Sequence, residues 1–230
     1  MLGARLIRGG RIERALVGGV DALSKFTLNG FNTLMIVDPE FCKPFDDNRN
    51  GLNLGEGAGY LVIESEKAMG NRIPLCEVKG FWNANDAFHQ TASSPDGRGP
   101  FLSMKKALEN AGLVPSDISY INAHGTATQN NDLSEGIAID RLFSNGVPPV
   151  SSTKSMTGHL LGASGAIEAG VSIISILNNI IPANLNFKTK MKELAFTPVS
   201  KLKKGVKINH VMSNSFGFGG NNTSLIFSKC

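Results

Sequence analysis

Residues 151–165 read SSTKSMTGHLLGASG, and a long apolar segment, residues 166–181, follows them. The stretch places Lys154 and His159 five residues apart among small hydroxyl and glycine residues. Small residues let a backbone approach a ligand closely, and the first turn of a helix offers unpaired N–H groups with partial positive charge. Burial and a neighbouring cation both depress a histidine's pKa. The pattern predicts a polar loop at the N-terminus of a buried helix; the alternative is a surface loop with an isolated histidine.

Two further motifs carry the same kinds of residue. Residues 120–128 read YINAHGTAT, and residues 214–222 read NSFGFGGNN. The three motifs together resemble those of the elongating β-ketoacyl–acyl carrier protein synthases, condensing enzymes of fatty-acid and polyketide assembly. That family has N-A-H-G-T, S-T-K-S-x-x-G-H and N-S-F-G-F-G-G-x-N in the same order. The resemblance runs from about Arg5 to the end, and two histidines, rather than His and Asn, indicate the elongating class rather than the priming class.

The resemblance implies a thiolase-like α/β fold with layers in the order αβαβα. It assigns residues 1–72 to the end of the N-terminal half and residues 73–230 to the complete C-terminal half. The alternation of predicted strands and helices through residues 73–230 is independently typical of an α/β layered fold. Apolar runs and turn residues predict strands at 15–20, 60–64, 75–81, 118–122, 147–150, 210–214 and 223–227. Helices are predicted at 4–14, 66–70, 101–111, 133–143 and 162–179, the last ended by Pro182.

His124, Lys154 and His159 arrive at the ends of successive predicted strands, where α/β proteins build sites. Two neutral imidazoles could each donate an N–H to one oxygen, which suits the enolate formed when a thioester loses carbon dioxide. The resemblance implies that His124 and His159 bind the thioester carbonyl and that Lys154 holds the hydrogen-bond network. By the same resemblance, Phe218 is the gating phenylalanine, its backbone N–H contributes to the oxyanion hole, and Phe216 is its neighbour in the gating loop.

A second set of residues is implied as a supporting network. Glu168 lies fourteen residues after Lys154 and is expected to pair with it, and Asp132, Glu135 and Asn214 match further family positions. The resemblance implies no required cofactor. In some members a structural cation is bound, here expected near Asn122, Glu168, Ser213 and Asn214.

The nucleophile is the main departure from the family, which carries the acyl chain on a cysteine in an Ala-Cys-x-x-Gly context. None of Cys42, Cys76 and Cys230 has that context. We therefore expect this chain to be the C-terminal portion of a synthase, unable to complete the catalytic cycle by itself. Asn221 stands where the family usually has Thr, in a loop that helps to seat the substrate's pantetheine arm.

Three functional hypotheses follow. The first is a decarboxylating Claisen condensation of malonyl–acyl carrier protein with an acyl-enzyme, in the full-length parent. The second is a partner subunit of the chain-length type, or a homologue that only decarboxylates; intact His124, Lys154 and His159 weigh against a subunit without chemistry. The third is an α/β fragment with no function of its own. The resemblance implies an acyl carrier protein as partner and a homodimer, and it leaves the chain length of the substrate open.

The amino-acid composition agrees with the partners and the location that the resemblance implies. The net charge of +4 permits an acidic partner, and no Lys/Arg run is dense enough to indicate nucleic acid. Three cysteines without a Cys-x-x-Cys pair argue against zinc and a disulfide framework, which fits a cytoplasmic protein. Residues 160–181 are long enough to cross a bilayer, but their many small and polar positions favour a helix buried in a soluble core. Charged residues make up only 18%, which agrees with a buried subunit interface.

Overall fold

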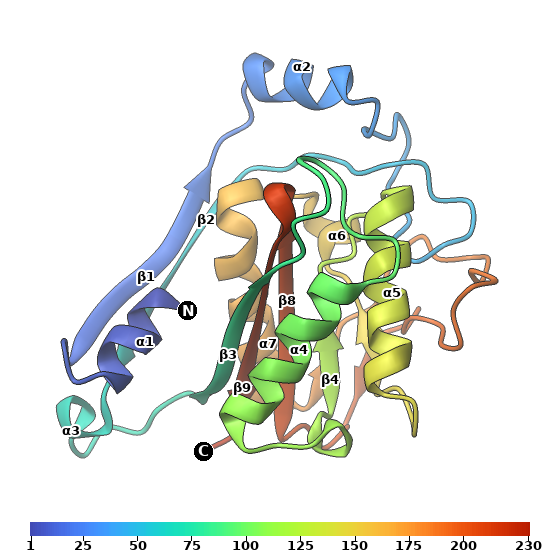
Figure 1. The fold of residues 1–230 in the computed structure, drawn as a ribbon. Coiled ribbons are helices and arrows are strands. Elements are labelled where there is room, and N and C mark those ends of the chain that lie inside the picture. The colour runs from blue at the N-terminus through green and yellow to red at the C-terminus, as the bar shows by residue number, and fades with distance from the viewer.

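A five-stranded sheet forms the centre of the computed structural model, which describes all 230 residues. The strand order is β3-β9-β8-β4-β5. β8 runs parallel to β4, β4 runs parallel to β5, and β8 pairs antiparallel with β9 (Figure 1). The strands are β3 (Glu77–Asn85), β4 (Tyr120–Asn122), β5 (Val150–Ser151), β8 (His210–Gly217) and β9 (Asn221–Ser228).

Helices cover both faces of this sheet. α4 (Arg98–Ala111) and α5 (Gln129–Leu142) lie on one face, and α7 (Ser164–Asn178) lies on the other. Because successive side chains of a strand point to opposite faces, neighbouring residues enter different cores. Ile121 packs in the core under α4 and α5, whereas Tyr120 packs in the core under α7. The central strands are therefore buried on both faces.

A second, two-stranded sheet packs against the other side of α7. β1 (Arg14–Asp21) and β2 (Gly57–Glu64) pair antiparallel in full register. The glycine-rich stretch before and within β2 allows close backbone packing. A Cβ atom on Gly59 would lie 3.1 Å from the Cβ atom of Ala166, and one on Gly55 would lie 2.2 Å from the carbonyl oxygen of Thr157. The layers thus run from α4 and α5 through the large sheet and α7 to β1 and β2.

The remaining elements are short. α1 (Leu2–Arg8) and α3 (Glu66–Met69) adjoin the two-stranded sheet, and α2 (Lys25–Thr33) stands apart at the top of Figure 1. The connections contain α6 (Lys154–Thr157), β6 (Ile180–Ile181), β7 (Lys203–Lys204) and the 3-10 turns η1 (Pro115–Asp117), η2 (Leu161–Ala163) and η3 (Phe218–Gly220).

The α/β class and the layered thiolase-like order are confirmed, and one predicted helix boundary is wrong. The first helix ends at Arg8 rather than at residue 14, because Gly9 and Gly10 follow it, whereas the strand predicted at 15–20 is present as β1. α7 ends at Asn178, within one residue of the predicted end, because Asn179 rather than Pro182 stops it with a left-handed φ of 53°. The left-handed residue closes the helix.

The burial of α7 also differs from the prediction. The helix is long and apolar enough to cross a membrane by length and composition alone. Its residues Ala169, Ile173 and Ile176 are buried, but Ile174 and Leu177 are about half exposed. The two sheets pack against opposite sides of α7, and the remaining sides of the helix stay open.

The outer face of the two-stranded sheet carries an exposed apolar surface. Leu16 is 70% exposed and faces Val62, which is 61% exposed, across the strands. Val20 and Tyr60 lie on the same face and are also exposed. Isolated exposed apolar residues are ordinary, but a contiguous patch of them marks a surface that contacts another molecule or another part of a protein.

Candidate active site

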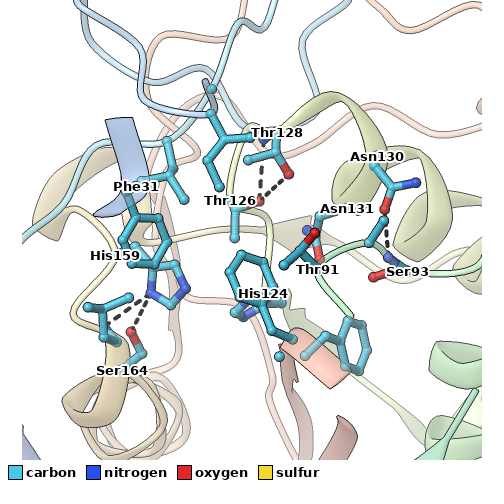
Figure 2. Close-up of a pocket in the computed structure, with 18 of the residues that line it drawn as sticks. Phe31, Thr91, Ser93, His124, Thr126, Thr128, Asn130, Asn131, His159 and Ser164 are labelled. Carbon is cyan, nitrogen blue, oxygen red and sulfur yellow. Dashed lines mark hydrogen bonds between the residues drawn. The ribbon is translucent and has the colours of Figure 1, made fainter. Parts of the chain in front are cut away.

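A cavity of about 660 Å³ opens at the carboxyl ends of the parallel strands β4, β5 and β8. His124 follows β4, His159 follows the connection after β5, and Phe216 lies near the end of β8. All three residues line the cavity, and Figure 2 shows the two histidines in its wall. The cavity lies where open α/β sheets place ligands, because loops from several strands converge there.

Two buried carboxylates hold the loop that carries His124. Glu135 accepts the backbone N–H groups of His124 at 3.0 Å and Gly125 at 2.8 Å. Asp132 accepts the backbone N–H of Ala127 at 3.1 Å. Ala127 has a φ of +68° and Gly125 a φ of +37°, so two residues of this loop lie in the left-handed region. The carboxylates stabilise a conformation that the chain would not adopt by itself.

Burial raises the pKa of both carboxyl groups. The pKa of Glu135 rises to about 7, because it has no access to water, and hydrogen bonds from Gly125 and Asn214 oppose the rise. Neither Asp132 nor Glu135 lines the cavity. Both therefore act on the backbone of the His124 loop rather than on a ligand, in line with the supporting role expected of them.

Lys154 is the buried cation of the site. Its side chain is 2% exposed and forms an ion pair with Glu168, as expected from the sequence. Its Nζ atom lies 3.2 Å from Nδ1 of His124. Lys154 does not itself line the cavity. It joins α7, through Glu168, to the loop after β4.

Both imidazoles are neutral. Burial, then the charge of Lys154, then His159 hold the pKa of His124 well below its usual value. Burial and then Lys154 lower the pKa of His159 to about 3. Each cause disfavours the charged ring, as desolvation and a neighbouring cation must.

The hydrogen bonds also determine which ring nitrogen carries the proton. The backbone N–H of Leu161 donates to Nδ1 of His159 at 3.2 Å. The hydroxyl of Ser164 lies 3.0 Å from the same atom (Figure 2). An ammonium group can only donate, so Nδ1 of His124 accepts from Lys154. A neutral imidazole has one donor nitrogen. In both rings that donor is therefore Nε2.

The two donor rings lie beside each other. The ring centroids of His124 and His159 are 5.2 Å apart, and the ring planes are 82° apart. The helix α7 begins at Ser164, which lines the cavity together with Gly165. The unpaired N–H groups of a helix's first turn add partial positive charge at this point. The arrangement suits an oxygen atom that gains negative charge.

The two phenylalanines of the third motif take different positions. Phe216 is buried, and its ring centroid lies 5.9 Å from that of His124. Phe218 is 48% exposed, and its ring stacks on Phe31 of α2 at 6.0 Å. Both line the cavity. Phe218 therefore lies at an exposed part of the cavity wall, and a role of its backbone N–H in an oxyanion hole stays a prediction.

The residues suggested as cation ligands divide into two groups. Asn122 Oδ1 and Glu168 Oε2 are buried and have no hydrogen-bond partner in the chain. Carboxylate and carbonyl oxygens are ligands that hard cations prefer, so these two fit. The Asn214 amide is occupied: it donates to Glu135 at 3.0 Å and accepts from Ser224 at 2.8 Å. A cation here would be held by Asn122 and Glu168, and its presence stays a prediction.

None of the three cysteines lines the cavity. Cys42 is buried, and its Sγ atom lies 3.5 Å from the backbone oxygen of Lys154. Burial raises the pKa of Cys42, and it raises that of Cys76 to about 12. A raised pKa disfavours the thiolate, which is the reactive form.

The structure adds residues that the sequence motifs did not single out for the site. Ser164 and the backbone of Leu161 fix the His159 ring. Phe31 supports Phe218 from an element far away in the chain. Thr91, Ser93, Asn130 and Asn131 form a polar wall (Figure 2). No pattern in the sequence indicated that Phe31 or this wall belongs to the cavity.

Comparison with known proteins agrees with these motifs. Residues 1–68 match the model of the β-ketoacyl synthase N-terminal domain, and residues 75–188 match that of the C-terminal domain. The chain is 38% identical, over 236 residues, to 3-oxoacyl-[acyl-carrier-protein] synthase 2 of Staphylococcus aureus. That alignment covers 98% of this chain and 57% of the relative.

Solved structures are similar over the whole chain. A β-ketoacyl synthase of Burkholderia phymatum has a TM-score of 0.94 and 35% identity, covering 100% of this chain and 58% of its own. A ketosynthase of Xenorhabdus doucetiae, solved in complex with its chain length factor, has a TM-score of 0.92 and 38% identity. The match covers 100% of this chain and 56% of the ketosynthase. The chain thus spans a little over half the length of the relatives it matches.

Proposed function

This chain belongs to the β-ketoacyl synthase family, and on that basis we propose that its cavity is the decarboxylation site of a 3-oxoacyl-[acyl-carrier-protein] synthase. The substrate is a malonyl thioester on an acyl carrier protein, and the product enters fatty-acid or polyketide synthesis. The observation that carries the proposal is the pair of neutral imidazoles, His124 and His159, with both Nε2–H donors in one cavity.

The proposed step uses these donors as follows. The bond between the α-carbon and the carboxylate of the malonyl group breaks, and carbon dioxide leaves. The electron pair of that bond passes to the α-carbon and the thioester carbonyl, which becomes an enolate. Nε2–H groups of His124 and His159 donate to the enolate oxygen, and donors already in place for developing charge lower the barrier. A charged imidazolium would give up its proton instead, which is why the neutral state matters.

Carbon–carbon bond formation needs a second group. The enolate carbon has to attack an acyl thioester, and the family holds that acyl group on a cysteine. No cysteine of this chain lines the cavity. We therefore expect the chain by itself to release carbon dioxide and leave an acetyl thioester, after the enolate takes a proton from water, without forming a condensed product.

The position of the cysteines also favours a second candidate, a partner subunit that shapes the acyl tunnel of an active synthase. The two candidates differ in one property. A subunit without chemistry has no use for the neutral histidine pair, so it would release no carbon dioxide. Under either candidate we propose an acyl carrier protein and a second synthase-like subunit as partners; a homodimer is the simplest case.

The deciding experiment measures carbon dioxide release from a malonyl thioester of pantetheine with the full chain. His124→Ala and His159→Ala should each lower the rate by about 100- to 1,000-fold, the usual effect of removing one oxyanion donor. His210→Ala is the matched control, since His210 does not line the cavity and lies at the start of β8, where its ring is 2.7 Å from the hydroxyl of Ser228. Equal rates for wild type and both cavity variants would refute the proposal. No release by the wild type would support the partner subunit.

A further inference from the structure

A lysine-rich segment lies between β6 and β8 in the chain. Residues 188–207 contain seven lysines, no arginine and one acidic residue, Glu193, so their net charge is +6. The whole chain carries +4, and the remainder of it is therefore slightly acidic, at −2. The positive charge of the protein is concentrated in this one segment, in Lys188, Lys190, Lys192, Lys201, Lys203, Lys204 and Lys207.

The charges of these lysines are not neutralised by the chain itself. All seven side chains are exposed, and none forms an ion pair. By contrast, six of the eight lysines elsewhere in the chain pair with a carboxylate. An anionic group of another molecule near this segment therefore meets positive charge that has no partner in the protein.

A second cavity, of about 420 Å³, lies at the C-terminal part of this segment. Residues 147–149 and 196–203 line it. Residues 147–149 lead directly into β5, and the backbone N–H of Val199 donates to the backbone oxygen of Val150 at 2.8 Å. The second cavity therefore lies at the amino end of β5, whereas the active-site cavity lies at the carboxyl ends of the parallel strands. A molecule bound in the second cavity leaves the active site open.

The walls of the second cavity are partly apolar. Val147, Phe196 and Leu202 supply apolar surface, and Leu202 is 51% exposed. The ring of Phe196 packs edge-on against Phe45 of the core, with the ring centroids 5.8 Å apart, which holds this wall in place. An apolar side chain of a ligand would leave water on entering the cavity, and this burial stabilises binding.

Lysines line the same cavity. Lys201 and Lys203 belong to its wall, and Lys204 follows in β7. β7 pairs with β6, where Lys203 stands opposite Ile181 and Lys204 opposite Ile180. The pairing fixes the backbone of these two lysines, while their side chains remain exposed. Apolar walls and unpaired positive charge thus occur together at one place.

The kinds of residue present distinguish among anionic partners. The segment has no arginine, the residue whose planar group binds phosphates in a bidentate manner. None of its aromatic side chains is exposed, so there is no platform on which nucleic-acid bases could stack. Leu202 is its only exposed large apolar side chain, which is too little to anchor the segment in a bilayer. A protein segment with carboxylates and one apolar side chain matches both the charge and the cavity.

We propose that the second cavity and the lysines beside it, Lys201, Lys203 and Lys204, form a docking site for an acidic segment of a partner protein. Carboxylates of the partner meet the three lysines, and one apolar side chain enters the cavity. The inference goes beyond the proposed function and does not depend on it. Because the docking site and the active site lie at opposite ends of β5, the protein can hold this partner and a substrate at the same time.

Binding of designed peptides to the full chain, followed by fluorescence anisotropy, tests both parts of the docking site. The first peptide alternates glutamate and glycine around one central phenylalanine. In the second peptide alanine replaces the phenylalanine, and in the third glutamine replaces every glutamate. The first should bind most tightly, the second more weakly because nothing fills the cavity, and the third weakest because it has no charge. Affinity for the first peptide should fall as the salt concentration rises.

A triple variant tests the lysines. Lys201→Gln, Lys203→Gln and Lys204→Gln together should weaken binding of the first peptide about tenfold, the effect of losing three exposed ion pairs. The matched control lowers the net charge by the same amount at exposed basic residues elsewhere and should bind within about twofold of wild type. Its changes are Arg11→Gln, Lys25→Gln and Lys229→Gln.

Leu202→Ala tests the apolar part of the docking site. It should weaken binding of the first peptide about fivefold, the effect of losing about half of a leucine's buried surface, and leave binding of the second peptide unchanged. Carbon dioxide release should be unchanged in this variant and in the triple lysine variant, since none of these residues lines the active-site cavity. Failure of the docking site is therefore distinguishable from failure of the proposed function.

Three results would overturn the inference: equal binding of the first peptide to the wild type and the triple lysine variant, equal binding of the first and second peptides, or equal effects of Leu202→Ala on both peptides. Two further probes represent other classes of partner, vesicles of phosphatidylserine with phosphatidylcholine and a single-stranded oligothymidylate. If either binds more tightly than the first peptide at the same salt concentration and loses affinity in the triple variant, the lysines serve a membrane or a nucleic acid, and docking of an acidic protein segment is refuted.

Discussion

Lys154 Nζ lies 3.2 Å from Nδ1 of His124, although thirty positions separate the two residues in the chain. The contact has two effects. The ammonium charge disfavours protonation of the ring, and the ammonium hydrogen occupies Nδ1, which leaves the ring's own proton on Nε2. Glu168 balances the charge of Lys154 from α7. The Lys154 ammonium thus determines the tautomer of a histidine in the cavity wall and adds to the effect of burial in keeping that histidine neutral.

The pH dependence of carbon dioxide release should show this effect. The neutral histidines are the active form, and their lowered pKa values keep them neutral well below pH 6.5. The wild-type rate should therefore not fall between pH 8 and about pH 5, where an ordinary histidine becomes charged. In Lys154→Met the charge of Lys154 no longer lowers the pKa values of the two histidines. The pH below which the rate falls should therefore rise toward 6.5. An unchanged profile in this variant would contradict the role of the Lys154 charge.

Stability in acid should depend on His159. Its pKa is about 3 in the folded protein, and about 6.5 in the unfolded chain. The unfolded state therefore binds more protons as the pH falls from 6.5 to 3, and the free energy of unfolding decreases over that window. At pH 5 the loss from this one group is about 2 kcal/mol. His159→Gln should remove that part of the acid sensitivity in denaturant titrations, whereas Asn178→Gln, an exposed change in α7, should not.

The Lys154–Glu168 pair should behave as a buried pair in a double-mutant cycle. Lys154→Met or Glu168→Leu alone leaves an unpaired buried charge and should lower the free energy of unfolding by about 3–5 kcal/mol. The double variant should cost clearly less than the sum, because no charge is left behind. Lys67→Met is the matched control, since its pair with Glu13 is exposed and should change stability very little. Additive effects at Lys154 and Glu168 would show that the pair is not coupled.

Glu135 should stabilise the loop of His124. Glutamine in its place would point an NH₂ group at one of two backbone N–H donors and leave that donor unpaired. Glu135→Gln should therefore lower the free energy of unfolding by about 1–3 kcal/mol. It should also slow carbon dioxide release without changing pantetheine binding, since Glu135 does not line the cavity. Glu109→Gln on the exposed side of α4 is the control, and equal melting temperatures for all three proteins would refute the role.

The exposed face of β1 and β2 should promote association. Leu16→Thr and Val62→Thr remove apolar surface that is already in water, so they should not lower the melting temperature. They should reduce self-association in sedimentation experiments at high protein concentration, because patches of this kind drive contacts. Val17→Thr is the matched control on the opposite face, where Val17 packs beneath Gly3, and it should destabilise. Unchanged association in the Leu16 and Val62 variants would exclude this face as the contact surface.

Most secondary structure followed from local patterns. The helix predicted at 101–111 ends at Ala111 as expected, because Gly112 closes α4 in the left-handed conformation. The helix predicted at 4–14 is shorter in the structure, because Gly9 and Gly10 end it after Arg8. The prediction that α7 is buried failed in part for another reason: its composition does not reveal which of its sides the two sheets cover and which stay open.

The sequence by itself determined the family, the α/β order of elements and the three motifs that supply His124, Lys154 and His159, because motif identity and period are local properties of a chain. Only the tertiary structure decided which nitrogen of each histidine donates, and that Asn214 is bonded to Glu135 and Ser224. Those properties depend on which groups from distant segments lie within about 3 Å of each other, and hydrogen-bond direction is set at that range.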